Sequence, residues 1–371
     1  MTKSSLPARE KWQAFLAGHD VGPMVSPLCD NWSLDVPYRW PYDGPEPLAA
    51  DEPNHILCEQ MAMAKVCGWD PTFLGSVGFV PRNADLNAVS QTQNIEGGKR
   101  NEYRTRTPYG DLVSIVEVKK TQHVVKQELA TEEDYRRKTW VLRGELDYDE
   151  DASIVQGRRL VQAVGDRGVL GTWFGPPYGL LNHDEMFYHM ADWPDACLEM
   201  MAAYRELELK RLRTLRKAGF DYLFYIVEAT EWLSPEFFEQ HVLPDTIEQT
   251  RLWRELGGFV LWHTCGRSKA LIERGFYNQC LPEIFETCSE APVGNLPSLK
   301  WARERLDRRI ATKGNVPLNL LLQGTPEQVR EDVRRIRRET AGYRHIVGLT
   351  DDILANTPLA NALAFVEEAR K

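Results

Sequence analysis

The chain has 371 residues, and its 54 Asp and Glu outnumber its 45 Lys and Arg to give a formal net charge of −9. This excess of acid argues against broad binding to nucleic acid or to anionic membranes. No apolar stretch approaches the ~20 residues of a membrane span, and the first residues lack the apolar core of a signal peptide. The seven scattered cysteines are therefore expected to be reduced thiols in a cytoplasmic protein.

Residues 1–150 form an elaborated N-terminal part in this prediction, with short strands near Val25 and near Val77. Tyr103–Thr107 and Leu112–Lys119 flank the turn signature Pro108-Tyr109-Gly110-Asp111, and this pattern predicts a β-hairpin. No internal repeat and no low-complexity tract interrupts the chain.

Residues 151–371 alternate regularly between strand and helix patterns. The predicted strands are Gly168–Phe174, Tyr222–Val227, Gly258–Trp262, Glu283–Glu286, Ile310–Thr312 and His345–Gly348. With the two N-terminal strands they total eight, which predicts an α/β fold, a single (β/α)₈ TIM barrel covering 1–371. A doubly wound open sheet is the alternative, and it is disfavoured because no glycine-rich phosphate fingerprint follows an early strand.

His263 and Cys265 close the strand at Gly258–Trp262 and are followed by Gly266, which permits a tight turn. Side chains two apart on a strand point to the same side, so both can reach one point in space. Imidazole nitrogen and thiolate sulfur together suit Zn²⁺, although either residue alone is more often an ordinary core residue.

Other chemically active side chains follow the remaining strands. In a barrel fold, the catalytic groups lie at the carboxyl ends of the strands. Two carboxylates, Glu228 and Glu286, each end an apolar strand. Burying a carboxylate costs free energy, so each is expected to have a function or a partner. With His263, Cys265 and Asp351, Glu286 would complete a zinc shell, and an open position would make the metal a Lewis acid. The expected substrate-binding residues on these ends are Trp173, Tyr178 and Asn315. The competing structural interpretations are tight connections, helix caps and turns.

Several short motifs in a specific order resemble the uroporphyrinogen decarboxylase superfamily, in particular its corrinoid-linked methyltransferase branch. The motifs are Tyr103–Gly110, Leu233–Phe238, His263–Gly266, Lys313–Val316, Gly324–Val329 and Asn356–Asn361. The resemblance covers most of the chain and implies a single-domain (β/α)₈ barrel.

The decarboxylase itself is the poorer match. Its Arg-rich loop after the first strand is replaced here by Pro27–Trp32, which carries Asp30 and Trp32 and no Arg. A polycarboxylate substrate needs cationic partners, and this loop offers an acid instead. We therefore expect Asp30 and Trp32 to contact a different substrate.

The methyltransferase branch implies a zinc ion bound by a His-x-Cys pair and a later Cys, and a methylcorrinoid carried on a partner protein. His263 and Cys265 match the pair, and Glu286 falls where a distant methionine synthase has an added Glu. Asp351 stands where the later Cys is expected, which makes the site harder and more Lewis-acidic.

Three functional hypotheses follow. The leading one is a methyltransferase that moves a methyl group between a small molecule and a corrinoid-binding protein, as in O- and N-demethylation, with Glu228 orienting substrate or handling a proton. The second is a metal-independent decarboxylase of a small carboxylic acid on the same fold. The third is a corrinoid- or tetrapyrrole-binding protein without catalysis.

Overall fold

The structure is a computed structural model, and it describes residues 6–29, 56–86, 88–180, 185–227, 232–264 and 266–371. The chain divides into two compact units. The first unit comprises Met1–Ser76, Gln156–Gly175 and Arg216–Lys371, and the second comprises Val77–Val155 and Pro176–Leu215. That the whole chain is a single domain stays a prediction. None of the described helices is both long and apolar enough to cross a membrane.

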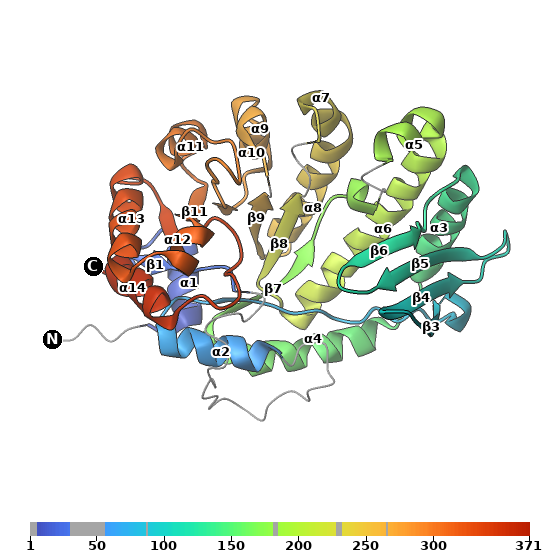
Figure 1. Ribbon diagram of the computed structural model, residues 1–371, viewed down its shortest axis with the longest axis horizontal. Coiled ribbons are helices and arrows are strands. Elements are labelled where there is room, and N and C mark those ends of the chain that lie inside the picture. Colours follow the sequence, from blue (N-terminus) through green and yellow to red (C-terminus); the bar gives the residue numbers. More distant parts are fainter. Residues whose placement is uncertain (1–5, 30–55, 87, 181–184, 228–231, 265) are drawn as a thin grey trace. The chain divides into compact units, whose positions relative to one another are not determined.

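The first unit is built on an eight-stranded parallel sheet with the strand order β1-β12-β11-β10-β9-β8-β7-β2. Its strands are β1 Met24–Val25, β2 Thr72–Leu74, β7 Val169–Phe174, β8 Tyr222–Val227, β9 Phe259–Thr264, β10 Ile284–Glu286, β11 Ala311–Val316 and β12 His345–Leu349. From β2 to β12 each strand of this sheet pairs with the next one along the chain, and β1 pairs with the last, β12, as in a TIM-like α/β fold. Figure 1 shows the curled sheet, with helices α9, α10, α11 and α13 around its outer side.

Along the described part of the chain, helices precede, connect or follow these strands. They are α1 Ala8–Leu16, α2 Ile56–Cys67, α3 Glu132–Glu145, α4 Glu150–Val164, α5 Met186–Asp192, α6 Pro194–Ala218, α7 Pro235–Phe237, α8 Leu243–Glu255, α9 Lys269–Glu273, α10 Phe276–Cys280, α11 Leu299–Arg305, α12 Leu318–Gln323, α13 Pro326–Glu339 and α14 Leu359–Ala369. Short 3₁₀ turns occupy Ala84–Leu86, Gly165–Arg167 and Pro177–Leu180, and a π-helical turn occupies Phe238–Val242. The Thr325 side chain and Gln328 form a capping box that begins α13.

The two end strands of the sheet are linked through Asp70, which precedes β2. The main-chain N–H of Val25 donates to Asp70 Oδ2 at 2.9 Å, and the N–H of Asp70 donates to Val25 O at 2.6 Å. Through these two bonds Asp70 pairs with Val25 and connects β1 to the segment that leads into β2.

The interior of the sheet is filled by one apolar side chain after another from successive strands. The cluster includes Trp12, Met24, Leu74, Val169, Tyr222, Phe224, Phe259, Leu261, Ile284, Ala311 and Ile346. Large branched and aromatic side chains of this kind form the packed core of a parallel barrel-like sheet. Leu261, Ile284 and Ala311 point into this interior. The side chains two positions further on in β9, β10 and β11 therefore point the same way.

The strand pattern predicted from the sequence differs from the structure mainly at strand ends. The second strand is β2 at Thr72–Leu74, so the strand predicted near Val77 is present but ends before that residue. A strand of three residues is too short to show an alternating pattern, and Gly75 and Gly78 follow it. Strands β9 and β11 extend to Thr264 and Val316, so His263 and Lys313 belong to strands and not to loops.

The second unit contains a four-stranded antiparallel sheet with the order β3-β4-β5-β6. Its strands are β3 Val89–Ile95, β4 Gly98–Thr105, β5 Leu112–Val118 and β6 Gln122–Lys126. Strands β4 and β5 pair from Thr105 and Leu112 outward, across the Pro108–Asp111 turn. The hairpin segments predicted from the sequence thus lie in a larger sheet, whose outer strands are polar and exposed and gave no alternating signal.

Candidate active site

Three charged or titratable side chains stand side by side on three adjacent strands. The register pairs His263 of β9 with Glu286 of β10, and Glu286 with Lys313 of β11. Each lies two residues beyond a core residue of its own strand, so all three face the interior, nearer the carboxyl ends of the strands. They are 3 %, 2 % and 1 % exposed. We call these three residues the polar row.

Glu286 contacts both of its neighbours in the polar row. His263 Nδ1 lies 2.7 Å from Glu286 Oε1, and Lys313 Nζ lies 2.6 Å from Glu286 Oε2. Burial alone would raise the pKa of Glu286, but the charge of Lys313 and the hydrogen bond and charge of His263 together lower it. Glu286 is therefore a buried carboxylate anion whose two oxygens are both engaged.

The second ring nitrogen of His263 is directed toward Asp351, which follows β12. His263 Nε2 and Asp351 Oδ1 are 3.8 Å apart. For comparison, two ligand atoms of a tetrahedral zinc ion lie roughly 3.3 Å apart when each zinc–ligand distance is about 2 Å. The separation of His263 Nε2 and Asp351 Oδ1 is somewhat larger than this. Asp351 Oδ1 also accepts the N–H of Asp352 at 2.7 Å, so the carboxylate caps its own turn while facing the histidine.

Four of the residues predicted from the sequence lie outside the described part of the chain. They are Cys265, Glu228, Asp30 and Trp32. Among the residues that the structure does describe, no group of three or more His, Cys, Asp and Glu side chains is arranged to hold a metal ion. The roles of these four residues, and the metal, remain predictions.

An aromatic wall lies beside the polar row. Trp173, at the end of β7, is 43 % exposed and packs edge-on against Phe224 of β8, with ring centroids 4.8 Å apart. Phe224 in turn lies 5.1 Å from the His263 ring. Trp173 was predicted to bind substrate, and its exposed ring leaves an apolar surface near the histidine. Tyr178, predicted to share that role, is buried at 1 % exposure in the second unit.

Asn315 is already engaged by protein groups. Its Nδ2 donates to Cys288 O at 3.0 Å, and its Oδ1 accepts from Arg335 Nη2 at 3.1 Å. The same region is bound together by Ser289 Oγ, which donates to Thr350 O at 3.1 Å. Asn315 thus ties the ends of β10 and β11 together, and its predicted contact with substrate remains untested.

Lys313 is a candidate site residue that the sequence did not single out. The predicted strand ended at Thr312, which left Lys313 in a loop, where a lysine is ordinarily solvated. Its position two residues after Ala311, a small apolar residue on the interior side, was the signal that it faces inward. The next residue, Gly314, has φ of +138°, and a Cβ there would lie 2.6 Å from Thr287 O. Only glycine allows the turn after β10 to approach so closely.

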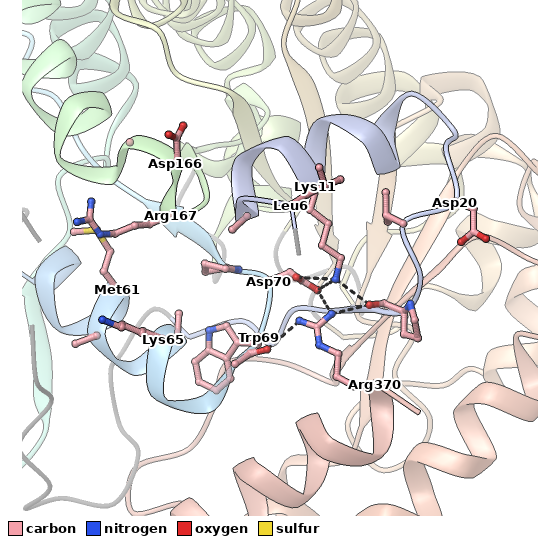
Figure 2. A pocket seen from close by; sticks show the side chains of 18 residues that line it. Leu6, Lys11, Asp20, Met61, Lys65, Trp69, Asp70, Asp166, Arg167 and Arg370 are labelled. Atoms are coloured by element: carbon pink, nitrogen blue, oxygen red, sulfur yellow. Dashed lines mark hydrogen bonds and ion pairs between the residues drawn. The ribbon is translucent and has the colours of Figure 1, made fainter. Parts of the chain in front are cut away.

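A large cavity lies at the other end of the strands, at their amino ends. It has a volume of about 1400 Å³ and is lined by α1, α2 and residues that precede β1, β2 and β7. Figure 2 shows Lys11 and Arg370 converging on Asp70 in one wall. In parallel barrel-like folds catalytic groups gather at the carboxyl ends of the strands, so the polar row and not this cavity is the candidate active site.

By its fold and by this site, the chain is a TIM-like α/β protein with a polar row at the carboxyl ends of its parallel strands. The family model described as "Uroporphyrinogen decarboxylase (URO-D)" matches residues 178–371, more than half of the chain. The chain belongs to the uroporphyrinogen decarboxylase family, as the sequence motifs predicted.

Individual relatives match shorter stretches. The uroporphyrinogen decarboxylases of Prochlorococcus marinus strains MIT 9303 and NATL2A are 41 % identical over 79 residues and 33 % identical over 82 residues. Each match covers 20 % of this chain and 22 % and 23 % of those relatives. Among solved structures, a methyltransferase from Methanosarcina mazei has a TM-score of 0.60 at 13 % identity, over 98 % of both chains. That likeness shows the fold.

Proposed function

We propose that this protein is a methyltransferase that moves a methyl group between a small molecule and a corrinoid carried on a partner protein. The observation that carries the proposal is the orientation of His263. Its Nδ1 is held by Glu286 at 2.7 Å, and its Nε2 faces Asp351 at the carboxyl ends of the strands. The whole-chain fold similarity to the methyltransferase from Methanosarcina mazei supports this activity over others known on the fold.

Two described side chains, His263 and Asp351, have the chemistry of metal ligands and face each other, and no third described donor joins them. An imidazole nitrogen and a carboxylate oxygen 3.8 Å apart need little movement to share one zinc ion. We propose that Cys265, which follows His263 closely in sequence, adds a thiolate. A bound Zn²⁺ would supply Lewis acidity toward a methyl donor or acceptor. The sequence also predicted Glu286 as a ligand.

The remaining residues would bind and orient the substrate. Trp173 and Phe224 offer an aromatic surface beside His263, which suits an aromatic or quaternary-amine methyl donor. Polar row residues are buried, so water is excluded on their side of the site. Glu228 is proposed to orient the substrate or to take up a proton, and Asp30 and Trp32 are proposed to contact it.

The test combines metal content with methyl transfer. Purified protein should contain one zinc ion per chain, and His263→Ala and Cys265→Ala should each lose the metal and the transfer of methyl groups to a corrinoid protein. His19→Ala is the matched control, because His19 is exposed and lies in the loop before β1. Full methyl transfer in both site variants would rule out this assignment.

The second candidate function is a metal-independent decarboxylase of a small carboxylic acid. The 41 % identity to a uroporphyrinogen decarboxylase over 79 residues favours it, as does a lysine in the site. The same purified protein separates the two functions. Release of CO₂ from a carboxylic acid by metal-free protein, with no methyl transfer, would support the decarboxylase.

A further inference from the structure

The four-stranded sheet of the second unit ends in two edge strands, β3 on one side and β6 on the other (Figure 1). Among the described residues β3 pairs only with β4, and all of its residues except the last, Ile95, are exposed. An edge strand presents a row of unpaired N–H and C=O groups that another strand can join. Proteins usually prevent such pairing, so the sequence of each edge strand is informative.

The β6 edge carries features that prevent pairing with a further strand. A β-bulge interrupts its pairing with β5, and the strand contains His123 and Lys126. Two more lysines, Lys119 and Lys120, lie just before it. A bulge twists the edge, and lysine side chains make the approach of a second strand unfavourable. The β6 edge is therefore protected.

The β3 edge has none of these features. The strand Val89–Ile95 contains no charged residue, no proline and no glycine, and it pairs with β4 in unbroken register. The charged side chains lie instead on β4, inside the sheet, and they are Lys99, Arg100, Glu102 and Arg104. A long, exposed and uncharged edge strand is suited to pairing with another chain.

The sequence of β3 is chemically symmetric about its central residue, Thr92. In an antiparallel pairing of two copies centred on Thr92, each side chain would lie opposite one of similar chemistry. The opposed pairs are Val89 with the partner's Ile95, Ser90 with the partner's Asn94, Gln91 with the partner's Gln93, and Thr92 with the partner's Thr92. Pairs of β-branched side chains and pairs of threonines stabilise adjacent strands. A shift of two residues in either direction would separate Val89 from the partner's Ile95.

We propose that β3 is a homodimer interface, in which two copies of this chain pair antiparallel about a two-fold axis at Thr92 and join their sheets into one. A two-fold interface uses the same surface on both copies, and a strand that is symmetric and uncharged meets this requirement. A single strand from each copy makes a small interface, so the dimer should dissociate on dilution. The inference does not depend on methyl transfer.

The first test uses the residue that would lie on the two-fold axis. Thr92→Lys and Thr92→Glu each place like charges opposite each other, so each should raise the dissociation constant of the dimer at least about tenfold. An equimolar mixture of the two variants should form dimers, because opposite charges then face each other. Thr92 is exposed, so each variant should fold, which circular dichroism checks. Sedimentation velocity over a range of concentrations measures the mass in each sample.

Two control variants separate the effect of charge from other effects. Thr92→Val loses the hydrogen bond that Thr92 Oγ1 donates to Asn101 Oδ1 at 2.9 Å but adds no charge, and it should remain dimeric. Val124→Lys adds a lysine on the exposed β6 edge and should also remain dimeric. The proposal would be overturned by a wild type that is monomeric at every concentration, by dimers of both charged variants, or by a mixture of them that stays monomeric.

The second test needs no variant, so it decides the question even if the charged variants do not fold. Hydrogen exchange at Val89–Ile95 should be slower in concentrated than in dilute wild-type protein, because dimerisation pairs the outer N–H groups of β3. Exchange at Gln122–Lys126 should not depend on concentration. Exchange at β3 that is equal at all concentrations would leave this edge to an extended segment of another protein and would overturn the homodimer.

Discussion

The buried ion pair between Lys313 and Glu286 makes a quantitative prediction about stability. In Lys313→Met the apolar side chain keeps a similar volume, but Glu286 remains 2 % exposed with one of its two oxygens abandoned. Removing one partner of a buried pair costs about 3–5 kcal/mol. The hydrogen bond to His263 persists at 2.7 Å, so the expected loss is at the lower end, about 3 kcal/mol.

A second substitution separates an unpaired charge from lost packing. Glu286→Gln in the Lys313→Met background removes the buried charge, and its amide oxygen can still accept the His263 N–H. The double variant should therefore regain about 2 kcal/mol of the loss, because a neutral pair leaves no uncompensated charge. Urea unfolding of the four proteins in the cycle, followed by circular dichroism, measures the coupling between the two sites.

The control for this cycle is an exposed ion pair. Lys300→Met removes a lysine that lies 3.9 Å from Glu304 at the surface, and it should change stability by less than about 0.5 kcal/mol. If Lys313→Met lost less than about 1 kcal/mol, or if the double variant were less stable than Lys313→Met, the polar row would not contain the buried charge pair on which the reasoning depends.

Two further predictions concern the surroundings of the site. Gly314→Ala should lose about 2–3 kcal/mol, because φ of +138° and a contact of 2.6 Å to Thr287 O leave no room for a Cβ, whereas Gly179→Ala, with open space around it, should be near neutral. Burial lowers the pKa of His345 to about 3, and an unfolded histidine titrates near 6.5. Between these values the unfolded chain binds more protons, so stability should fall as pH drops from about 6.5 toward 3. The fall should be shallower in His345→Gln, and equal slopes of the free energy of unfolding against pH in both proteins would contradict the prediction.

The sequence was informative about the fold because the strands of a parallel sheet are continuous apolar runs. Tyr222–Val227 is buried almost throughout, and the strand was predicted with the same bounds. The prediction failed where strands are short or end in polar residues. β2 has only three residues. β11 continues through Lys313, Gly314 and Asn315, whose sequence pattern is typical of a loop.

The site was predictable only in part for a related reason. His263 and Glu286 stand out because polar residues end apolar strands, and the structure brings them together at 2.7 Å. Lys313 does not stand out, because a lysine after an apolar run is usually exposed. Its inward direction depends on the register of β11 against β10, which pairs Lys313 with Glu286, and register is a property of the assembled sheet.

A comparison of two buried carboxylates shows why position decides function here. Asp70 resembles Glu286, because it is 4 % exposed and has two basic partners, Lys11 at 2.9 Å and Arg370 at 2.8 Å. Asp70 also accepts the N–H of Val25, so every described contact of this carboxylate joins parts of the fold at the amino ends of the strands.

Glu286 differs in what its partner leaves available. His263 contacts Glu286 through Nδ1, and its Nε2 faces Asp351. Lys11 and Arg370, in contrast, both also donate to the main-chain oxygen Pro23 O. Under the proposed function, Asp70→Asn should therefore lose about 2–4 kcal/mol of stability and retain the affinity for zinc at a temperature where it is folded. Glu286→Gln should lose zinc affinity. If both variants lost zinc affinity equally while folded, the orientation of His263 would not be the feature that defines the site.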